Sequence, residues 1–464
     1  MVFAAAATAL TATIGPDARW LAALGRVVVE RGGIPHGIPF AAASSGSWPN
    51  VPVLSELTFH GLFAAFGDRG LLAAQVLAVA TGMAVLGRDM RRSGATDAGA
   101  AIVMALLVPG ALLAFAGIKA QVFSLALFPV AAALLRAEAR QPSRRIWLAV
   151  PLLALWSNLH GAALLGLAVV LAYLLLERAR HARLESLAVG AASALALCAT
   201  PALARTPQYY AAVMTSEAAK RGYGLWAPLS LHAGFDVVLL AVALPLLAAF
   251  LWARPRLWEL AAAAGLAGLT VHAARDGVWL LLFVAAPAAS RLRVGARPHP
   301  AVAHALALLC LLVGALGLVR GPQAAGAESA VVARAIHAAH GRPILAEPAT
   351  AERIAAAGGR VWISNPLDAF EPSAQRAYLD WLDGKPSGLL VTVRIVVVTP
   401  GSPAAQRLTH DGRFRVALKP GRYVLRPATA TGALPRSVPV VVDVQPGKYA
   451  SVTVRFDSGI RMRA

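Results

Sequence analysis

The feature that most constrains this chain is a succession of long apolar runs joined by short connections rich in arginine. Of the 464 residues, 58% are hydrophobic and 14% are charged, whereas about a quarter of a soluble domain is charged. A helix needs roughly 20 apolar residues to cross a bilayer. The sequence therefore predicts a mainly α-helical, polytopic membrane protein, in which the first run is short for a complete span. About eleven candidate spans lie near residues 1–15, 70–87, 98–117, 120–135, 146–159, 161–176, 186–203, 236–253, 257–273, 277–290 and 303–319.

The arginine clusters indicate which ends of these helices face the cytoplasm. Lys and Arg accumulate in cytoplasmic loops, and placing every cluster inside gives an alternation of sides without exception. The first outer loop is then 16–69, a second long outer loop is 204–235, and the chain from 320 onward is extracytoplasmic. The clusters are Arg88–Arg92, Arg136–Arg145, Arg178–Arg183, Arg254–Arg256 and Arg291–Arg297.

One polar interruption falls between two apolar runs, in the stretch LWSNLHGAALLGL. The predicted alternation places Asn158 and His160 at an outer turn, where Gly161 lets the chain reverse. One interpretation is that both side chains only cap the two helix ends. The other is that they belong to an outer-face site, with His160 orienting a substrate group and Asn158 supporting it by hydrogen bonding.

Acids, histidines and basic residues from separate outer loops favour the second interpretation, because ionisable groups beside membrane helices are costly and often functional. A carboxylate among histidines and basic residues suits proton abstraction together with stabilisation of an anionic leaving group, such as a phosphate. Each residue also has a structural alternative: Asp17, for example, follows Gly-Pro and is placed to cap a helix. The candidates are Asp17, Arg19, His36, Glu56, Lys119, Gln121, Arg205, His272 and Arg275.

Several function classes lack their motifs in this sequence. There is no Walker loop for ATP-driven transport, no GxSxG elbow and no DxD pair. HExxH and paired cysteines are also missing, so no metal-ligand set is predicted, although a divalent cation is left open as a cofactor. The formal net charge of +20 comes without a basic patch interleaved with aromatics, so nucleic acid is not expected as a partner.

Several stretches resemble bacterial multi-span membrane proteins of the C-type glycosyltransferase (GT-C) superfamily, in a poorly characterised branch. They are GPDARWLAALGRVVVERGGIPHGIPF with SWPNVPVLSEL, IKAQVFSLALF, LWSNLHGAALLGL and LTVHAARDGVWLLLFVAAPAA, in matching order over residues 10–320. The resemblance implies a membrane glycosyltransferase that moves a sugar from a polyprenyl-phosphate sugar to an envelope glycan or protein on the outer membrane face. The position that matches the family's carboxylate is Asp17, which would act as base or position the acceptor.

The chain departs from the usual branch pattern at three points. No histidine follows Trp20, and Lys119 and Ala120 stand where arginine and proline are usual. These departures keep a non-catalytic membrane scaffold as one alternative function. A transporter of lipid or glycan is another, although few charges fall at mid-span.

The C-terminal part changes in character after residue 320. Residues 321–410 are expected to form a small extracytoplasmic α/β region with apolar runs at RPILAE and GRVWIS, and VRIVVV at 393–398 is a strand candidate. Residues 411–464 predict a β-rich tail of hairpins with Pro-Gly turns. The tail resembles carboxypeptidase-regulatory-like β modules of exported bacterial proteins, and a stabilising role is favoured over acceptor binding.

Overall fold

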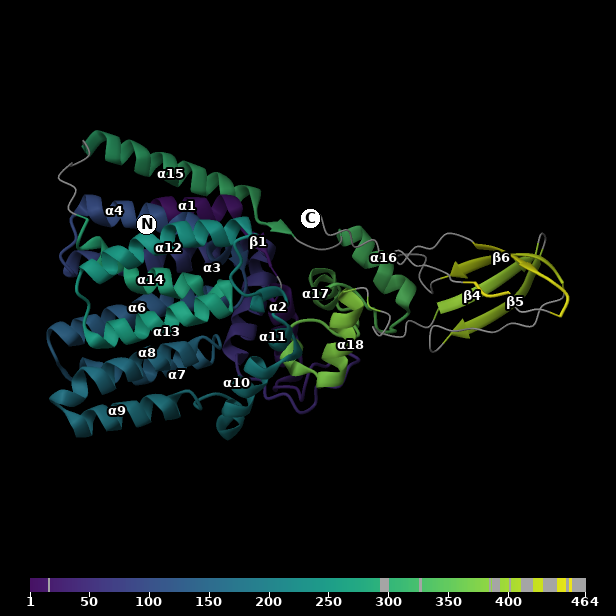
Figure 1. Cartoon of the computed structure of the whole chain (residues 1–464), viewed down its shortest axis with the longest axis horizontal. Coiled ribbons are helices and arrows are strands. Elements are labelled where there is room, and N and C mark those ends of the chain that lie inside the picture. Colours follow the sequence, from purple (N-terminus) through teal and green to yellow (C-terminus); the bar gives the residue numbers. More distant parts are fainter. Residues whose placement is uncertain are drawn as a thin grey trace.

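The chain is mainly helical, as predicted. The structure is a computed structural model that describes residues 1–15, 17–292, 300–324, 328–383, 385, 393–399, 402–409, 420–428, 440–447 and 450–452. Figure 1 shows a bundle of long helices, a smaller group of helices at one of its ends, and a separate sheet beyond them.

Each of the eleven predicted spans overlaps a helix of the bundle. Within the described ranges, four helices, α3, α6, α12 and α15, are long and apolar enough to cross a membrane, so the number of spans stays a prediction. Every residue of α14 is buried, which places this helix at the centre. The bundle contains α1 Val2–Thr11, α3 Val53–Arg92, α4 Asp97–Gly110, α5 Leu112–Ala116, α6 Gln121–Arg140, α7 Ala149–Ser157, α8 Ala163–Leu176, α9 Arg183–Ala196, α12 Gly234–Trp252, α13 Leu257–His272, α14 Gly277–Ala289 and α15 Pro300–Arg320.

The connections that carry the arginine clusters meet at one end of the bundle. Hydrogen bonds join Thr96 to the Leu292 carbonyl and Arg291 to the Ala253 carbonyl. Arg256 contacts the Glu177 carboxylate. The sequence pattern predicted that these connections share a side, and in the structure they lie together.

At the other end, three two-residue strands form a parallel sheet in the order β2-β1-β3. They are β1 Thr13–Ile14, β2 Gly117–Ile118 and β3 Gln323–Ala324. Parallel pairing aligns the carboxyl ends of β1 and β2, so Asp17, three residues after β1, and Lys119, directly after β2, emerge side by side.

The helix α2 Ala18–Arg31 begins directly after Asp17 and packs on the first half of α3, which is interrupted at Gly67. A Cβ at Gly25 would lie 2.1 Å from the Glu56 carbonyl oxygen, so only glycine allows this close approach. The packing holds the start of α2 against the segment of α3 that carries Glu56.

The small helical group joins three outer segments that are far apart in the sequence: the first outer loop, residues 206–221 and the C-terminal region. Its helices are α10 Thr206–Thr215, α11 Glu217–Arg221, α16 Ser329–Ala339, α17 Pro348–Ala356 and α18 Pro372–Leu382, and α11 contacts α18 while α17 contacts α2 and α16. Trp20, Phe40, Tyr209 and Tyr378 belong to their common core. The two apolar runs expected at RPILAE and GRVWIS touch through a single parallel bridge between Ile344 and Val361.

The separate sheet is antiparallel, in the order β5-β4-β6-β7. Its strands are β4 Val393–Thr399, β5 Ser402–Thr409, β6 Gly421–Ala428 and β7 Val440–Val444, so the predicted strand at 393–398 is present. The sheet contains strands on both sides of residue 410, and the domain boundary placed there stays a prediction. The parts of the predicted β-rich tail at 411–419, 429–439, 448–449 and 453–464 lie outside the described residues.

Candidate functional site

A cavity of about 430 Å³ lies where the bundle meets the small helical group. Its polar residues come from the first outer loop, from turns between bundle helices and from the C-terminal region. We call it the polar cavity. Its lining includes Asp17, Glu56, Lys119, Gln121, His160, His272, Arg275, Asp276 and Asp368, with the aromatic side chains of Trp20, Trp48, Tyr209, Tyr210, Trp226 and Trp279.

Asp17 occupies the cap position of α2 without capping it. Its φ is 87°, outside the extended region usual for such caps, and its side chain makes no cap hydrogen bond. The carboxyl group lines the polar cavity instead. Burial raises the pKa of Asp17, while the nearby Lys119 and Arg275 cations oppose the rise. A carboxylate with a raised pKa beside two cations can accept a proton from a substrate hydroxyl.

Lys119 and Arg275 provide the positive charge of the polar cavity. Neither forms an ion pair with a carboxylate in the part of the chain that the structure describes. Burial lowers the pKa of Lys119 to about 8, with Asp17 acting in the opposite direction. The Arg275 guanidinium stacks 3.9 Å from the centre of the Trp226 ring. Asp17 and Asp276 lie near these two partly buried cations but form no ion pair with them among the described residues, so an anion such as phosphate can bind there.

His160 is held as a neutral hydrogen-bond donor. Its Nδ1 lies 2.8 Å from the Ser124 hydroxyl, which itself accepts the Trp156 indole N–H at 2.7 Å. The Ala162 backbone N–H also donates to Nδ1, at 3.3 Å. These contacts assign the ring proton to Nε2. Because burial lowers the pKa of His160 to about 3, the ring stays neutral and Nε2–H can donate to a ligand.

Three further predicted residues also line the polar cavity, namely Glu56, Gln121 and His272. Glu56 is fully buried, and the Asn50 side-chain amide donates to its Oε2 at 2.9 Å. Its other oxygen, Oε1, has no hydrogen-bond partner among the described residues. Buried polar atoms are almost always partnered, so Glu56 Oε1 retains an unused capacity to accept a hydrogen bond.

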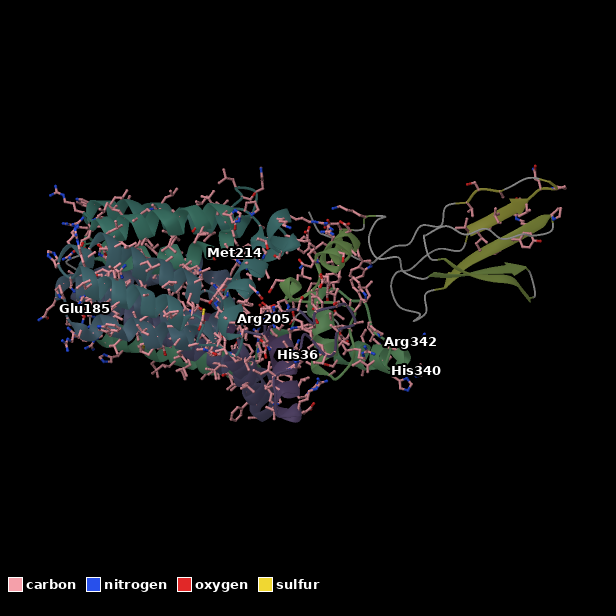
Figure 2. All side chains as sticks on the ribbon, turned by 90° about the horizontal axis from the view of Figure 1, so that it is seen from below. His36, Glu185, Arg205, Met214, His340 and Arg342 are labelled. Atoms are coloured by element: carbon pink, nitrogen blue, oxygen red, sulfur yellow. The ribbon has the colours of Figure 1, made fainter. Side chains whose placement is uncertain are left out.

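The structure places the remaining predicted residues outside the cavity lining. Arg19 is buried and forms an ion pair with Asp68 at 2.8 Å, and Asn158 donates to the carbonyls of Ala154 and Ala199. His36 is exposed, and Arg205 donates to the Ser47 carbonyl. Figure 2 shows His36 and Arg205 near the junction of the bundle with the C-terminal helices. Their assignment to substrate binding stays a prediction.

The most informative residue that the sequence did not point to is Asp368, from the C-terminal region. It lines the polar cavity next to Pro366, and its Oδ2 has no hydrogen-bond partner among the described residues. Burial raises the pKa of Asp368 to about 6, and Asp17 adds to the rise while Arg275 opposes it. The only local signal was the polar turn SNPLD after an apolar run, which by itself indicates a loop.

A second cavity, of about 270 Å³, shares a wall with the polar cavity. The shared residues are Lys119, Gln121, Leu225 and Arg275. Leu113 and Phe235 in its lining are 57% and 54% exposed, so it opens to the surface of the bundle. We call it the apolar groove, because most of its other lining is apolar and includes Pro109, Leu112, Leu113, Ala114, Phe235, Leu239 and Val278. The lining also contains one acidic residue, Asp236.

No group of three or more His, Cys, Asp or Glu side chains that could hold a metal ion occurs within the described ranges. The site's own side chains offer four carboxyl groups, those of Asp17, Glu56, Asp276 and Asp368, together with the two cations Lys119 and Arg275 and the neutral imidazole of His160.

Comparison with known proteins gives one distant likeness. No protein-family model and no curated protein match the chain. Among solved structures it is similar to two crystal structures of ArnT from Cupriavidus metallidurans, one bound to undecaprenyl phosphate and one in the apo state. The TM-score is 0.42 for both, with 15% and 14% identity over 82% of this chain and 69% and 70% of theirs. A likeness this distant does not define the activity or the ligands of this chain.

The fold and the site nevertheless define a class. The chain is a mainly helical protein with several apolar helices long enough to cross a membrane, which are the features of an integral membrane protein. At one end of its bundle, a charged cavity meets an apolar groove.

Proposed function

We propose that this chain is a membrane glycosyltransferase that moves a sugar from a polyprenyl-phosphate sugar to an envelope glycan or protein. It would lie in the bacterial plasma membrane, with the polar cavity and the C-terminal region on the extracytoplasmic side. The sequence resemblance to the GT-C superfamily suggested this reaction, and the chemistry of the cavity supports it independently.

The observation that carries the proposal is the wall shared by the polar cavity and the apolar groove. Lys119 and Arg275 belong to both. A phosphate bound by these two cations would leave an isoprenoid tail in the apolar groove and a sugar in the polar cavity. The ligand class that matches this arrangement has an apolar chain, a phosphate and a polar head in that order.

The transfer step follows from the placement of the charges. The acceptor hydroxyl oxygen forms a bond to the anomeric carbon of the sugar, and the bond from that carbon to the phosphate oxygen breaks. Asp17 takes the proton of the hydroxyl, and the lipid phosphate leaves as an anion stabilised by Lys119 and Arg275. No proton has to be supplied to a phosphate leaving group, so a neutral His160 suffices as a donor that orients it.

The remaining carboxyl groups of the cavity suit the acceptor. Glu56 and Asp368 both line the cavity, and each has one buried carboxyl oxygen without a hydrogen-bond partner among the described residues. Such oxygens accept hydrogen bonds from hydroxyl groups, which polyhydroxylated acceptors supply. Asp368 thereby gives the C-terminal region a share in the site.

The experiment that tests the proposal is a transfer assay in membranes. Radiolabelled polyprenyl-phosphate sugars are supplied to the wild-type chain, to Asp17→Asn and to Asp383→Asn. Asp383 is the matched control, because it is a carboxylate of the C-terminal region that pairs with Lys385 at 2.9 Å, away from the cavity lining. Loss of a general base reduces the rate by about 10²- to 10⁴-fold, so we expect label transfer by the wild type and Asp383→Asn only.

Two results would contradict the proposal in different ways. Equal transfer by the wild type and Asp17→Asn would remove Asp17 from the mechanism. Absence of transfer by the wild type, across several donor sugars in membranes that contain native acceptors, would favour a non-catalytic scaffold or a transporter.

A further inference from the structure

One buried carboxyl group lies next to the polar cavity without lining it. Glu352 in α17 is 2% exposed, accepts a hydrogen bond from the Asn365 side chain and forms no ion pair among the described residues. Both of its carboxyl oxygens also lie within hydrogen-bond distance of the backbone N–H of Asp17, at 2.8 and 2.7 Å. Burial and the neighbouring Asp17 carboxyl group raise the pKa of Glu352 well above its usual value, so Glu352 meets Asp17 as a neutral hydrogen-bond acceptor from 335 positions away.

The contact falls at the amino end of α2, where a helix has unpaired backbone N–H groups that need an acceptor. An aspartate at this position normally uses its own side chain as the cap. Asp17 does not, because its φ of 87° turns the residue out of the usual cap conformation. Glu352 supplies the acceptor for the Asp17 N–H in its place, which leaves the Asp17 carboxyl group to line the polar cavity.

A second contact fixes α17 against α2. The Arg26 guanidinium donates to the carbonyls of Ala356 and Ala355, at 3.0 and 3.2 Å. Ala355 and Ala356 are the last residues of α17, where carbonyl groups lack helical partners. The two helices are therefore joined at both ends of their contact, one by Glu352 and the other by Arg26.

We propose that Glu352 is a positioning residue that holds the catalytic Asp17 in its cavity-facing conformation. The C-terminal region is then part of the transfer site rather than an attachment to it. This inference rests on the proposed function for the role of Asp17, and on the two hydrogen bonds for the role of Glu352.

The test compares Glu352→Ala and Glu352→Gln with the wild type in nanodiscs. Glu371→Gln is the matched control, since Glu371 is an exposed glutamate of the same region without a side-chain contact to α2. Two quantities are measured: hydrogen exchange at the Asp17 amide by fragmentation mass spectrometry, and kcat and KM for transfer. A merely structural role would lower the amount of folded protein without changing kcat per folded molecule.

In Glu352→Ala we expect faster exchange at the Asp17 amide and a kcat lower by about 100-fold, with KM changed by less than about threefold, because displacement of a catalytic group by about 1 Å costs that much. Glu352→Gln keeps one acceptor oxygen and should recover about tenfold of that loss. Glu371→Gln should match the wild type in both measurements.

Wild-type exchange at Asp17 in Glu352→Ala would overturn the proposal, and so would faster exchange with an unchanged kcat. Absence of transfer by the wild type would instead overturn the proposed function. In that event, exchange at the Asp17 amide would still decide whether Glu352 holds the residue in place.

Discussion

The two ends of the helix bundle bury similar side chains in different ways. At the end opposite the polar cavity, Arg136 donates to Asp89 at 2.7 Å and to Glu259 at 3.1 Å, and it contacts the Phe283 carbonyl. We call Arg136, Asp89 and Glu259 the closed cluster. In the polar cavity, Lys119 and Arg275 lack a carboxylate partner among the described residues. Figure 2 marks the end of the closed cluster with Glu185.

The difference distinguishes a structural use of buried charge from a ligand-binding use. Gln121, which lines the polar cavity, and Arg136 lie on one helix, 15 residues or about 22 Å apart. In the closed cluster each charge is neutralised by the protein, so the cluster can lock α3, α6 and α13 together. In the polar cavity Lys119 and Arg275 line the cavity wall without an ion pair among the described residues, so an anionic ligand can pair with them. A structural cluster and a ligand-binding cluster therefore differ in whether their charges have ion-pair partners, and not in their residue types.

The largest expected effect tests the closed cluster. Arg136→Leu leaves Glu259 buried without its cation and Asp89 with only the 3.5 Å contact to Arg140, which should lower the free energy of unfolding by about 3–5 kcal/mol. Thermal unfolding of the detergent-solubilised chain would measure it. Replacing Arg136, Asp89 and Glu259 together by apolar residues should restore most of the stability. If Arg136→Leu were as stable as the wild type, the closed cluster would not contribute to the stability of the fold.

Lys119→Ala should have the opposite profile. We expect affinity for polyprenyl phosphate to fall about 10- to 100-fold, since a hydrogen bond to a charged group contributes about 1.5–3 kcal/mol. Stability should not decrease, because Lys119 has no carboxylate partner among the described residues. Binding of labelled polyprenyl phosphate measures the effect, with Lys220→Ala, a surface lysine paired with Glu217, as the control. If Lys119→Ala were less stable than the wild type and bound the lipid equally well, Lys119 would have a structural role like that of the closed cluster.

The helices of this bundle could be predicted from the sequence because membrane spans are long apolar runs whose backbone bonds are local. The burial of Arg136 could not be predicted, because its arginine cluster was expected to lie in a loop. Nothing in that local pattern indicated that Arg136 would pair with Asp89 and Glu259. The same limit applies to Asp17 and Lys119, whose proximity depends on pairing between strands of two residues each.

Asp368 and Glu352 show a second limit. Both act through the docking of the C-terminal helices on the first outer loop, about 335 positions away in the case of Glu352. The local pattern around Asp368 indicates a turn, and the one around Glu352 indicates an amphipathic helix. Neither pattern contains information about which distant surface the residue will face.

The pH dependence of transfer sharpens the comparison further, because only the cavity groups should titrate with activity. Lys119 is cationic below its lowered pKa of about 8, so kcat/KM should fall about tenfold per pH unit above that value. The raised pKa of Asp17 should limit activity on the acid side, where its carboxylate is protonated. Lys119→Arg keeps its charge at high pH and should remove the alkaline decline. An alkaline decline that persists in this variant would assign it to another group.

The smallest expected effect concerns His160. Ser124→Ala removes one of the two donors to Nδ1 and the acceptor of the Trp156 N–H, while the Ala162 N–H remains. A single hydrogen bond contributes about 1 kcal/mol, so kcat/KM should fall about fivefold. Ser157→Ala is the matched control, because among the residues that the structure describes the Ser157 hydroxyl donates to the Ala154 carbonyl of its own helix alone. If both variants lost stability and Ser124→Ala kept its kcat/KM, Ser124 would support packing alone. The Ala162 N–H would then be sufficient to fix the tautomer of the His160 imidazole.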